Sequence, residues 1–385
     1  MNQAQKERYA ENYGVVLVPE ETSARVFNDV DSFKGRCPEI LQEIEEKITD
    51  YARNYAEDEQ DIRMKTNALN KLQAFIRDIF PEAILKQVGS TITKLSTKKS
   101  DMDLCLVVRD GNGEFDQSHS FALHTLQVLY DELCDERPDM ISFHKFIDSA
   151  VVPIVKIYLN DEFADLEVDI NCNVLPVFLS NHLVLHYVTF DPRVQPLILA
   201  IKRWAKNLQV SASQKGGLNS FSFVMMAIHF LQSVCFPMIL PNFWKMFPHT
   251  FDDNAPVNLR RDLSHDRCIP PMTNMMRNDR SIAELFLGFI SYYSRFDWDQ
   301  HAIVIRAGCL ANRCEVYEQD EISAKMYIEE PYDRFNTART VRRQEDKEAI
   351  IGKLRSLAER VFSKGNRDRE ILTLLDGQDP EEGEL

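Results

Sequence analysis

Residues 88–108, VGSTITKLSTKKSDMDLCLVV, join a small-residue turn to a strand that carries two acids. Even-numbered positions from 102 to 108 are apolar, whereas Asp101 and Asp103 lie on the alternate set. Because residues two apart in a strand point to the same face of a sheet, both carboxylates project together and the apolar face is free to enter a core. Neighbouring carboxylates repel each other unless a cation lies between them, and oxygen ligands suit a hard divalent ion. The stretch therefore predicts a metal site, with Mg²⁺ as the expected ion.

Gly89 and Ser90 end a predicted strand over residues 82–88. A glycine allows close approach of the backbone, and a serine offers both a hydroxyl and an amide to a phosphate. Taken alone, a D-x-D pair or a Gly-Ser pair is a common surface feature without function. With ten residues between Ser90 and Asp101 and an apolar strand after the acids, the combination resembles the DNA polymerase beta-like nucleotidyltransferase superfamily.

A third acid, Asp169, lies within a predicted strand over residues 166–172. Its neighbours Val168 and Ile170 are apolar, which is an unfavourable position for a carboxylate unless a fixed cation compensates it. Glu167 and Asp165 share its alternation and are alternative ligands. The apolar flanks favour Asp169.

Length and charge limit the classes of protein that are compatible with this chain. Its 385 residues exceed the usual size of a single core, about 250 to 300 residues, so two domains are expected. A formal charge of −15 argues against a broad basic surface that wraps nucleic acid, so contact with RNA should be local or made through a partner. No stretch approaches the ~20 apolar residues of a membrane span, and no signal peptide is evident. We expect a soluble cytoplasmic protein with no membrane partner.

The eight cysteines are scattered and form no C-x-x-C pair, so we expect reduced thiols within the core rather than a zinc site.

Hydrophobic periodicity predicts strands in the first half of the chain and helices at both ends. Strands are expected at 82–88, 104–108, 142–147, 151–159 and 166–172, with the nearly all-apolar 151–159 in the centre of a sheet. Helices are expected at 38–55, 61–80, 118–134, 194–206, 218–235, 281–294 and 337–364. Residues 91–100 should form a turn or short helix, 251–280 a loop, and 376–385 a solvated acidic tail.

These elements predict an α+β protein, in which a palm with a mixed sheet is inserted into a mainly helical domain. The expected boundaries are 1–59 for an N-terminal arm and helices, 60–190 for the palm, 191–365 for the helical domain and 366–385 for the tail. Lys202 and Lys206 lie four residues apart on one helix face, where they could meet a triphosphate. On spacing alone, an exposed basic stripe is the favoured interpretation.

Seven ordered motifs between residues 60 and 345 resemble the cytoplasmic terminal RNA nucleotidyltransferases, and most closely the germline-development (GLD-type) cytoplasmic poly(A) polymerases. The motifs are GSTITKLSTKKSDMDLCLVV, VDINCN, SNHLVL, PRVQPLILAIKRWAKN, GGLNSFSFVMM, LFLGFISYYSRFDW and IEEPYDRFNTART. Many ordered motifs over most of a chain are more specific than any one of them.

The resemblance implies a palm and a helical domain that enclose a cleft for a nucleotide and an RNA 3′ end. Asp101, Asp103 and Asp169 would be the catalytic triad that holds Mg²⁺, with Mn²⁺ as the alternative ion. The resemblance further implies nucleotide contacts: to the triphosphate from Gly89 and Ser90, to its phosphates from Lys202 and Lys206, to sugar or phosphate from Asn181 and Ser220, and to the base from Phe221. The sequence departs from the family at His182, where Thr is usual, and at Phe221, where Tyr is usual, which puts a hydroxyl contact there in doubt.

The implied activity is template-independent addition of AMP from ATP to RNA 3′ ends by two-metal chemistry. Residues 328–340 contain no His, whereas related uridine-adding enzymes commonly carry one there, so ATP should be preferred over UTP. A terminal uridylyltransferase is the alternative activity. A catalytically silent scaffold is disfavoured by the three acids, and an enzyme that modifies small molecules is disfavoured by the IEEPYDRFNTART segment.

The family also implies a separate RNA-binding protein as partner. The positive charges expected near the cleft are few, namely Lys94, Lys98, Lys99, Lys202 and Lys206, and this supports only weak RNA binding by the chain alone.

Overall fold

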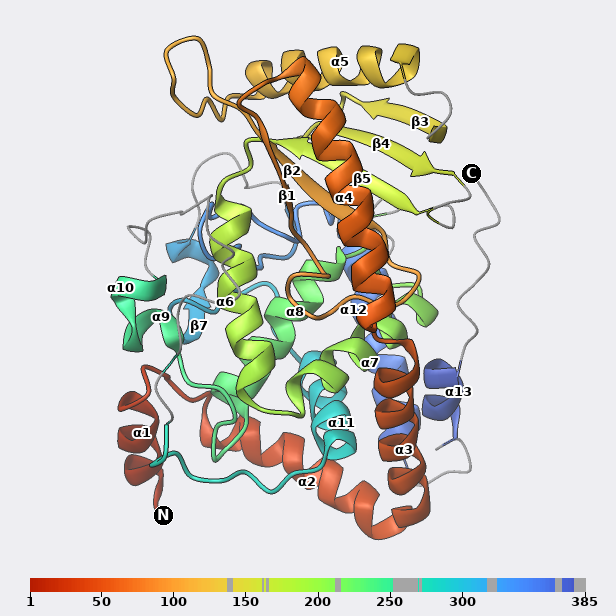
Figure 1. Ribbon diagram of the computed structural model, residues 1–385. Coiled ribbons are helices and arrows are strands. Elements are labelled where there is room, and N and C mark those ends of the chain that lie inside the picture. Colours follow the sequence, from red (N-terminus) through yellow and green to blue (C-terminus); the bar gives the residue numbers. More distant parts are fainter. Residues whose placement is uncertain are drawn as a thin grey trace. The chain divides into compact units, whose positions relative to one another are not determined.

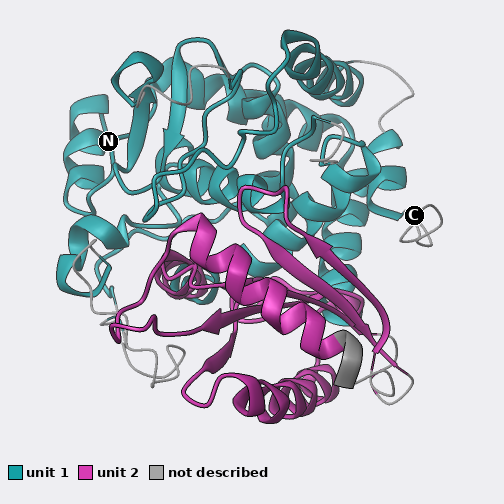
Figure 2. Cartoon of the chain, turned by 90° about the horizontal axis from the view of Figure 1, so that it is seen from above, with its two compact units in different colours: residues 1–54, 186–255, 268–385 teal, residues 55–185, 256–267 magenta. Residues whose placement is uncertain are grey.

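The computed structural model describes residues 1–136, 141–160, 163, 166–211, 216–251, 269, 272–316, 324–363 and 369–376. The chain divides into two compact units, which Figure 2 distinguishes by colour. Unit 2 is formed by residues 55–185 and 256–267, and unit 1 by residues 1–54, 186–255 and 268–385. Each unit is described by itself below.

Unit 2 is built on a five-stranded mixed sheet with the strand order β1-β2-β5-β4-β3 (Figure 1). Strands β2 and β5 run parallel, and the other neighbours are antiparallel. This mixed sheet beside helices confirms the predicted α+β class. The strands are β1 (Ile84–Gln87), β2 (Met102–Val107), β3 (Ile141–Ile147), β4 (Ile154–Leu159) and β5 (Glu167–Cys172).

Strand β4 lies inside the sheet, between β5 and β3, as its apolar composition predicted. Buried and half-buried residues alternate along β4 as they do along β5, which occupies the middle position among the five strands.

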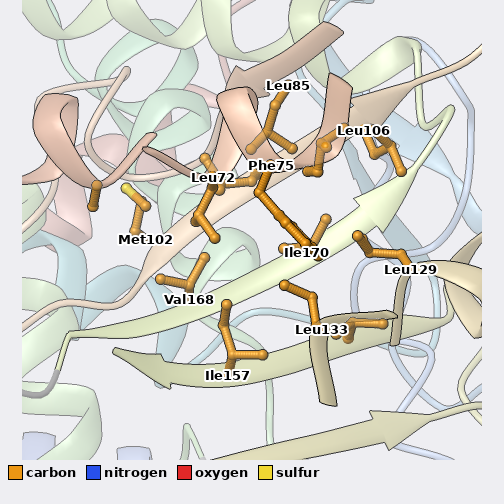
Figure 3. Close-up of a cluster of buried hydrophobic side chains, with 14 of the residues drawn as sticks. Leu72, Phe75, Leu85, Met102, Leu106, Leu129, Leu133, Ile157, Val168 and Ile170 are labelled. Atoms are coloured by element: carbon orange, nitrogen blue, oxygen red, sulfur yellow. The ribbon is translucent and has the colours of Figure 1, made fainter. Parts of the chain in front are cut away.

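Two helices, α4 (Glu59–Ile79) and α5 (His119–Glu136), supply the core against one face of this sheet. Figure 3 shows Leu72 and Phe75 from α4 and Leu129 from α5 meeting side chains of the strands. The even-numbered apolar residues at 102, 104 and 106 of β2 belong to the same cluster, as their alternation predicted. Burial of one such side chain stabilises the fold by about 1.5–3 kcal/mol.

Helix α4 begins two residues earlier than expected because of its cap. The Asp58 side chain accepts hydrogen bonds from the amides of Gln60 and Asp61, and the Asp61 side chain accepts one from the amide of Asp58. This reciprocal pair satisfies amides that the first turn would otherwise leave unbonded.

On the opposite face of the sheet lies a smaller apolar cluster of Val88, Cys105, Val107 and Phe178. Phe178 belongs to α6 (Pro176–Phe190), a helix that periodicity did not predict because both of its faces are apolar. Cys105 and Val107, which follow Asp103 on the same face of β2, belong to this cluster. Asp103 therefore lies at the edge of an apolar layer.

Unit 1 is mainly helical, and it also contains a two-stranded sheet. Its helices are α1 (Gln3–Glu11), α2 (Glu20–Arg36), α3 (Pro38–Tyr55), α7 (Val194–Asn207), α8 (Ser220–His229) with the π-helical turn η3 (Phe230–Val234), α9 (Phe243–Met246), α10 (Pro248–Phe251), α11 (Ile282–Tyr293), the 3₁₀ turn η4 (Arg313–Glu315), α12 (Gln344–Phe362) and α13 (Glu370–Asp376). Its strands are β6 (His301–Val304) and β7 (Cys309–Asn312).

Residues 1–35, part of which we expected to form an arm, contain the helices α1 and α2. Val26, Val30 and Phe33 bury one stripe of α2, which packs beside α11. Ion pairs between Asp29 and Arg295 and between Asp31 and Arg280 hold the same two segments together. The apolar stripe is short and surrounded by charge, which made this helix appear polar in the sequence.

Helix α12 begins at Gln344 rather than at 337, because the preceding residues use their side chains to bind backbone groups. The predicted loop over 251–280 and the tail over 376–385 lie largely outside the described residues.

Cys105, Cys172 and Cys235 are buried free thiols, as expected, but Cys314 is exposed. No helix among the described residues has the length and apolar character needed to cross a membrane.

We predict that Leu72→Ala lowers the free energy of unfolding of unit 2 by about 2–5 kcal/mol, since it leaves a cavity between α4 and the sheet. Native-state hydrogen exchange of the β2 amides measures this unit separately from unit 1. Ile62→Ala is the matched control, because Ile62 lies on the same helix but is 46% exposed. An equal effect of both substitutions would contradict the assignment of the core.

Candidate active site

The pairing of three strands brings acidic and basic side chains into one row. Parallel pairing of β2 and β5 sets Asp103 opposite Asp169, and antiparallel pairing of β4 and β5 sets Lys156 on the other side of Asp169. Asp101 and Glu167 each lie two residues earlier along the chain, and so share the faces of Asp103 and Asp169. Four acids and one lysine are therefore concentrated at one place in unit 2.

Asp101, Glu167 and Asp169 each offer a carboxylate oxygen, and these oxygens lie within 4.8 Å of one another. Oxygen ligands of this kind suit a divalent cation. Asp169 Oδ1 is buried, and the ammonium group of Lys156 lies 3.2 Å from it. Burial of a carboxylate among other acids is costly, and a metal ion at this position would compensate the negative charge. The residues present fit a divalent metal.

Lys156 is the positive charge closest to these acids. Its Nζ lies 3.2 Å from Asp169 Oδ1 and contacts Glu167 more closely, while the Tyr158 hydroxyl donates to Glu167 Oε2 over 2.7 Å. Burial alone would lower the pKa of Lys156, but its hydrogen bond with Glu167 and the charges of Asp169 and Glu167 raise that pKa above the usual value. Lys156 thus stays charged and neutralises part of the cluster.

The pKa of Asp169 is raised, mainly by burial and also by the negative charges of Asp101 and Glu167, against the opposing effect of Lys156. The protein alone therefore does not fully stabilise the ionised carboxylate. Further positive charge at the site would favour it, which agrees with the metal fit above.

Asp103 lies against the predicted phosphate-binding turn. Gly89 has a φ of +76°, and a Cβ at this position would collide with the Asp103 carboxylate. The Val88 amide also donates to the Asp103 carbonyl over 2.9 Å. Only glycine permits this approach, so the turn and the acid are fixed to each other.

The predicted triad of Asp101, Asp103 and Asp169 stays a prediction, because no metal position distinguishes its members from Glu167. Sequence reasoning ranked Glu167 below Asp169, whereas the structure places both in the three-oxygen cluster. Asp165, the other alternative, lies outside the described residues. Sequence reasoning overlooked Lys156, although a lysine in the otherwise apolar segment VVPIVKIYL was a usable signal.

Asn181 lies on α6 and is 5% exposed, and its Nδ2 has no hydrogen-bond partner. An amide donor left without a partner is suited to contact a ligand, but the predicted sugar or phosphate contact stays a prediction. His182, where the family usually has Thr, is also buried.

The other predicted nucleotide contacts belong to unit 1. On α7, Lys202 is half-buried and Lys206 is exposed in the last turn. Ser220 is the exposed first residue of α8 and Phe221 is half-buried beside it, after the cap that Asn219 forms with the Ser222 amide. The cleft expected to join these residues to the acids stays a prediction.

The segment 328–340 is tied to the start of α8. Ser222 Oγ donates to Thr337 Oγ1 over 2.8 Å, and Thr340 Oγ1 donates to the Gly217 carbonyl over 2.7 Å. The buried Asn336 side chain accepts from the amides of residues 328 and 338 and donates to the carbonyl of residue 326. This motif is therefore a shaped loop anchored beside Ser220 and Phe221.

Two families of known proteins match parts of the chain. The family described as "Poly(A) RNA polymerase, mitochondrial-like, central palm domain" matches residues 44–189, and "Cid1 family poly A polymerase" matches residues 281–336. The first match contains the acids and the Gly-Ser turn, and the second contains much of the 328–340 loop.

Individual relatives agree with these matches. Poly(A) RNA polymerase GLD2 of Rattus norvegicus is 31% identical over 313 residues, which cover 79% of this chain and 61% of that protein. GLD2-A of Xenopus laevis is 32% identical over 348 residues, covering 90% and 64% respectively. This chain thus spans less than two thirds of these relatives. A solved structure, that of a GLD-2/RNP-8 complex, has a TM-score of 0.70 and 27% identity, and covers 88% of this chain and 99% of that one.

We predict that Mg²⁺ or Mn²⁺ raises the thermal stability of the protein, because an ion that binds only the folded state at ten times its Kd adds about 1.4 kcal/mol. Asp169→Asn should remove most of this gain. Asp148→Asn is the control, since it deletes the same charge at an exposed position of the same unit. Thermal unfolding with and without metal measures both. An equal metal-dependent shift in the two variants would place the ion elsewhere.

Proposed function

We propose that this chain, which is similar to the GLD2 poly(A) RNA polymerases, adds AMP from ATP to RNA 3′ ends without a template. The observation that carries the proposal is the concentration of Asp101, Asp103 and Asp169 on adjacent strands, directly beside the Gly89 turn. The proposed place of action is the cytoplasm.

In this proposal the three aspartates hold Mg²⁺. Two bound ions would lower the pKa of the RNA 3′-hydroxyl and stabilise the departing pyrophosphate during in-line attack on the α-phosphate. Asp101 and Asp103 would hold these ions, and Asp169 would help to hold the ion that activates the 3′-hydroxyl. Lys156 keeps the cluster from carrying its full negative charge before metal and nucleotide arrive.

The remaining predicted residues orient the nucleotide. The backbone at Gly89 and the hydroxyl and amide of Ser90 bind the triphosphate, which approaches closely because residue 89 has no side chain. Lys202 and Lys206 neutralise phosphate charge, Asn181 and Ser220 bind sugar or phosphate, and Phe221 stacks on the base. Each of these roles rests on the family motif at that position together with the local geometry described above.

The preferred nucleotide in this proposal is ATP. The anchored 328–340 loop contains no His. Its shape is fixed by the Asn336 side chain and by the carboxylates of Glu330 and Asp333, which accept from amides of the same loop.

We predict that the purified chain extends an RNA primer with ATP more efficiently than with UTP in the presence of Mg²⁺, and that Asp103→Ala abolishes the extension while leaving the fold intact. The substitution removes a metal ligand and relieves repulsion between carboxylates. Primer extension with each nucleoside triphosphate separately measures both effects, and circular dichroism checks the fold.

Equal or better use of UTP would support the terminal uridylyltransferase instead. Extension by Asp103→Ala at the unmodified rate would reject the metal assignment. Transfer of the nucleotide to small acceptors but not to RNA would favour an enzyme that modifies small molecules.

A protein that recruits RNA completes the proposal. The chain carries a formal charge of −15, so its affinity for a polyanion depends on a few local lysines. The related GLD-2 was solved in a complex with RNP-8, which supports a protein partner for this chain as well. The partner's contribution would be to raise the local concentration of the RNA 3′ end.

We predict that the isolated chain binds and extends RNA poorly above ~0.15 M salt, where exposed charges are screened within about 8 Å. Fusing an unrelated RNA-binding domain through a flexible linker should raise extension of RNA carrying its target sequence by about 100-fold or more, since tethering raises the effective concentration. The control is the same fusion with RNA that lacks the target. Fast, salt-resistant extension by the chain alone would exclude this need for recruitment.

A further inference from the structure

A buried lysine outside the acidic cluster connects the phosphate-binding turn to the first metal ligand. Lys65 lies on α4 and is 1% exposed. Its Nζ donates to the carbonyls of Ser100 over 2.8 Å and of Asp101 over 3.0 Å, and it forms a 2.5 Å ion pair with Glu57 Oε1. With a longer fourth contact, from Nζ to Thr91 Oγ1, the three protons of the ammonium group are divided among four acceptors.

The same network reaches the segment after Ser90. Thr91 Oγ1 lies 3.3 Å from the Lys65 ammonium and donates to Glu57 Oε1 over 3.1 Å. Thr91 directly follows the predicted phosphate-binding serine, and Asp101 directly precedes β2. One cation therefore holds both ends of the loop over residues 91–100.

Stability alone is a poor explanation for this arrangement. The Glu57 side chain is only 6% exposed, so the pair removes two full charges from water. Apolar residues of similar volume often replace such a pair without loss of stability, because the desolvation cost offsets the attraction. Two of the three proton acceptors of Lys65 are backbone carbonyls at the entry to β2, and hydrogen bonds there fix the main chain from which the Asp101 carboxylate projects.

We propose that Lys65, with Glu57 as its counter-ion, is a positioning residue that sets the Asp101 carboxylate at a fixed distance from the Gly89–Ser90 turn. This inference rests on the proposed function, since it assigns Asp101 to the metal and the turn to the nucleotide phosphates. Lys65 itself touches neither. It acts through the main chain at residues 100 and 101 and through Thr91.

The test uses a double variant that carries both Lys65→Met and Glu57→Gln and so loses both buried charges together. Its properties are compared with those of the unmodified chain. We expect Mn²⁺ affinity, measured by electron paramagnetic resonance of the free ion, to fall by about 10- to 100-fold, as for other changes that disturb metal ligands indirectly. The rate of AMP addition should fall by about 100-fold, because misplacement by 1 Å is enough for such a loss. The temperature of unfolding should change little.

Lys347→Met is the matched control. Lys347 is also a buried lysine, 3% exposed, and it pairs with Asp299 in unit 1 over 2.6 Å. Its substitution should leave Mn²⁺ affinity unchanged. A decrease equal to that of the Lys65 variant would show a general effect of removing buried lysines and would overturn the proposal.

Thr91→Val keeps the proposal testable if the paired variant does not fold, because it exchanges one hydroxyl for a methyl group. It should weaken Mn²⁺ binding less than the paired substitution does, but measurably. Unmodified Mn²⁺ affinity in a folded paired variant, or in Thr91→Val where the paired variant is unfolded, would overturn the proposal. Metal binding is measured without RNA, so the role of Lys65 is tested independently of the activity. If the chain binds Mn²⁺ but adds no AMP, the proposed function is rejected, and the comparison of Mn²⁺ affinities still decides the role of Lys65.

Discussion

The parallel pairing of β2 with β5 is the constraint on which the site depends. It sets Asp103 beside Asp169, an arrangement that electrostatic repulsion alone would oppose. The opposite face of the same strands carries Leu104 and Ile170, both completely buried against α4 and α5. A shift of one residue in register would exchange the two faces, exposing the apolar side chains and burying the acids. Hydrophobic burial therefore maintains the concentration of negative charge at this site.

Two lysines lie near this charge and act in different ways. Lys156 lies among the carboxylates and interacts directly with Glu167 and Asp169. Attraction between charges is stronger in a poorly solvated interior than in water, so Lys156 lowers the energy of keeping these two acids close together. Lys65 is fully buried and has its own counter-ion in Glu57, so it acts on the main chain beside Asp101 rather than on the charge of the cluster.

Local patterns in the sequence predicted much of this structure. Alternation over 101–108 predicted both the core face of β2 and the common direction of its acids, and periodicity located α3, α7 and α11 within a few residues. Apart from Glu57, the partners of Lys65 lie 26, 35 and 36 residues away along the chain, and no local period connects such distant groups. The late start of α12 was missed for a related reason, because side chains such as Thr337 bind the backbone where propensity alone would continue a helix.

The separation between the Gly-Ser turn and the acids has a physical explanation in these contacts. At one end of the intervening loop, Gly89 packs directly on the Asp103 carboxylate, which no residue with a side chain would allow. The Lys65 ammonium group contacts both the first residue of the loop, Thr91, and the carbonyl of Asp101, which directly follows the loop. Each side of the turn is thus fixed to one of the two acids, and the loop between them closes on itself through the hydrogen bond from the Leu95 amide to the Ser90 carbonyl. A rigid link of this kind keeps the turn and the acids in a constant geometry although they lie on different elements, and positioning of this kind is what the proposed chemistry would need.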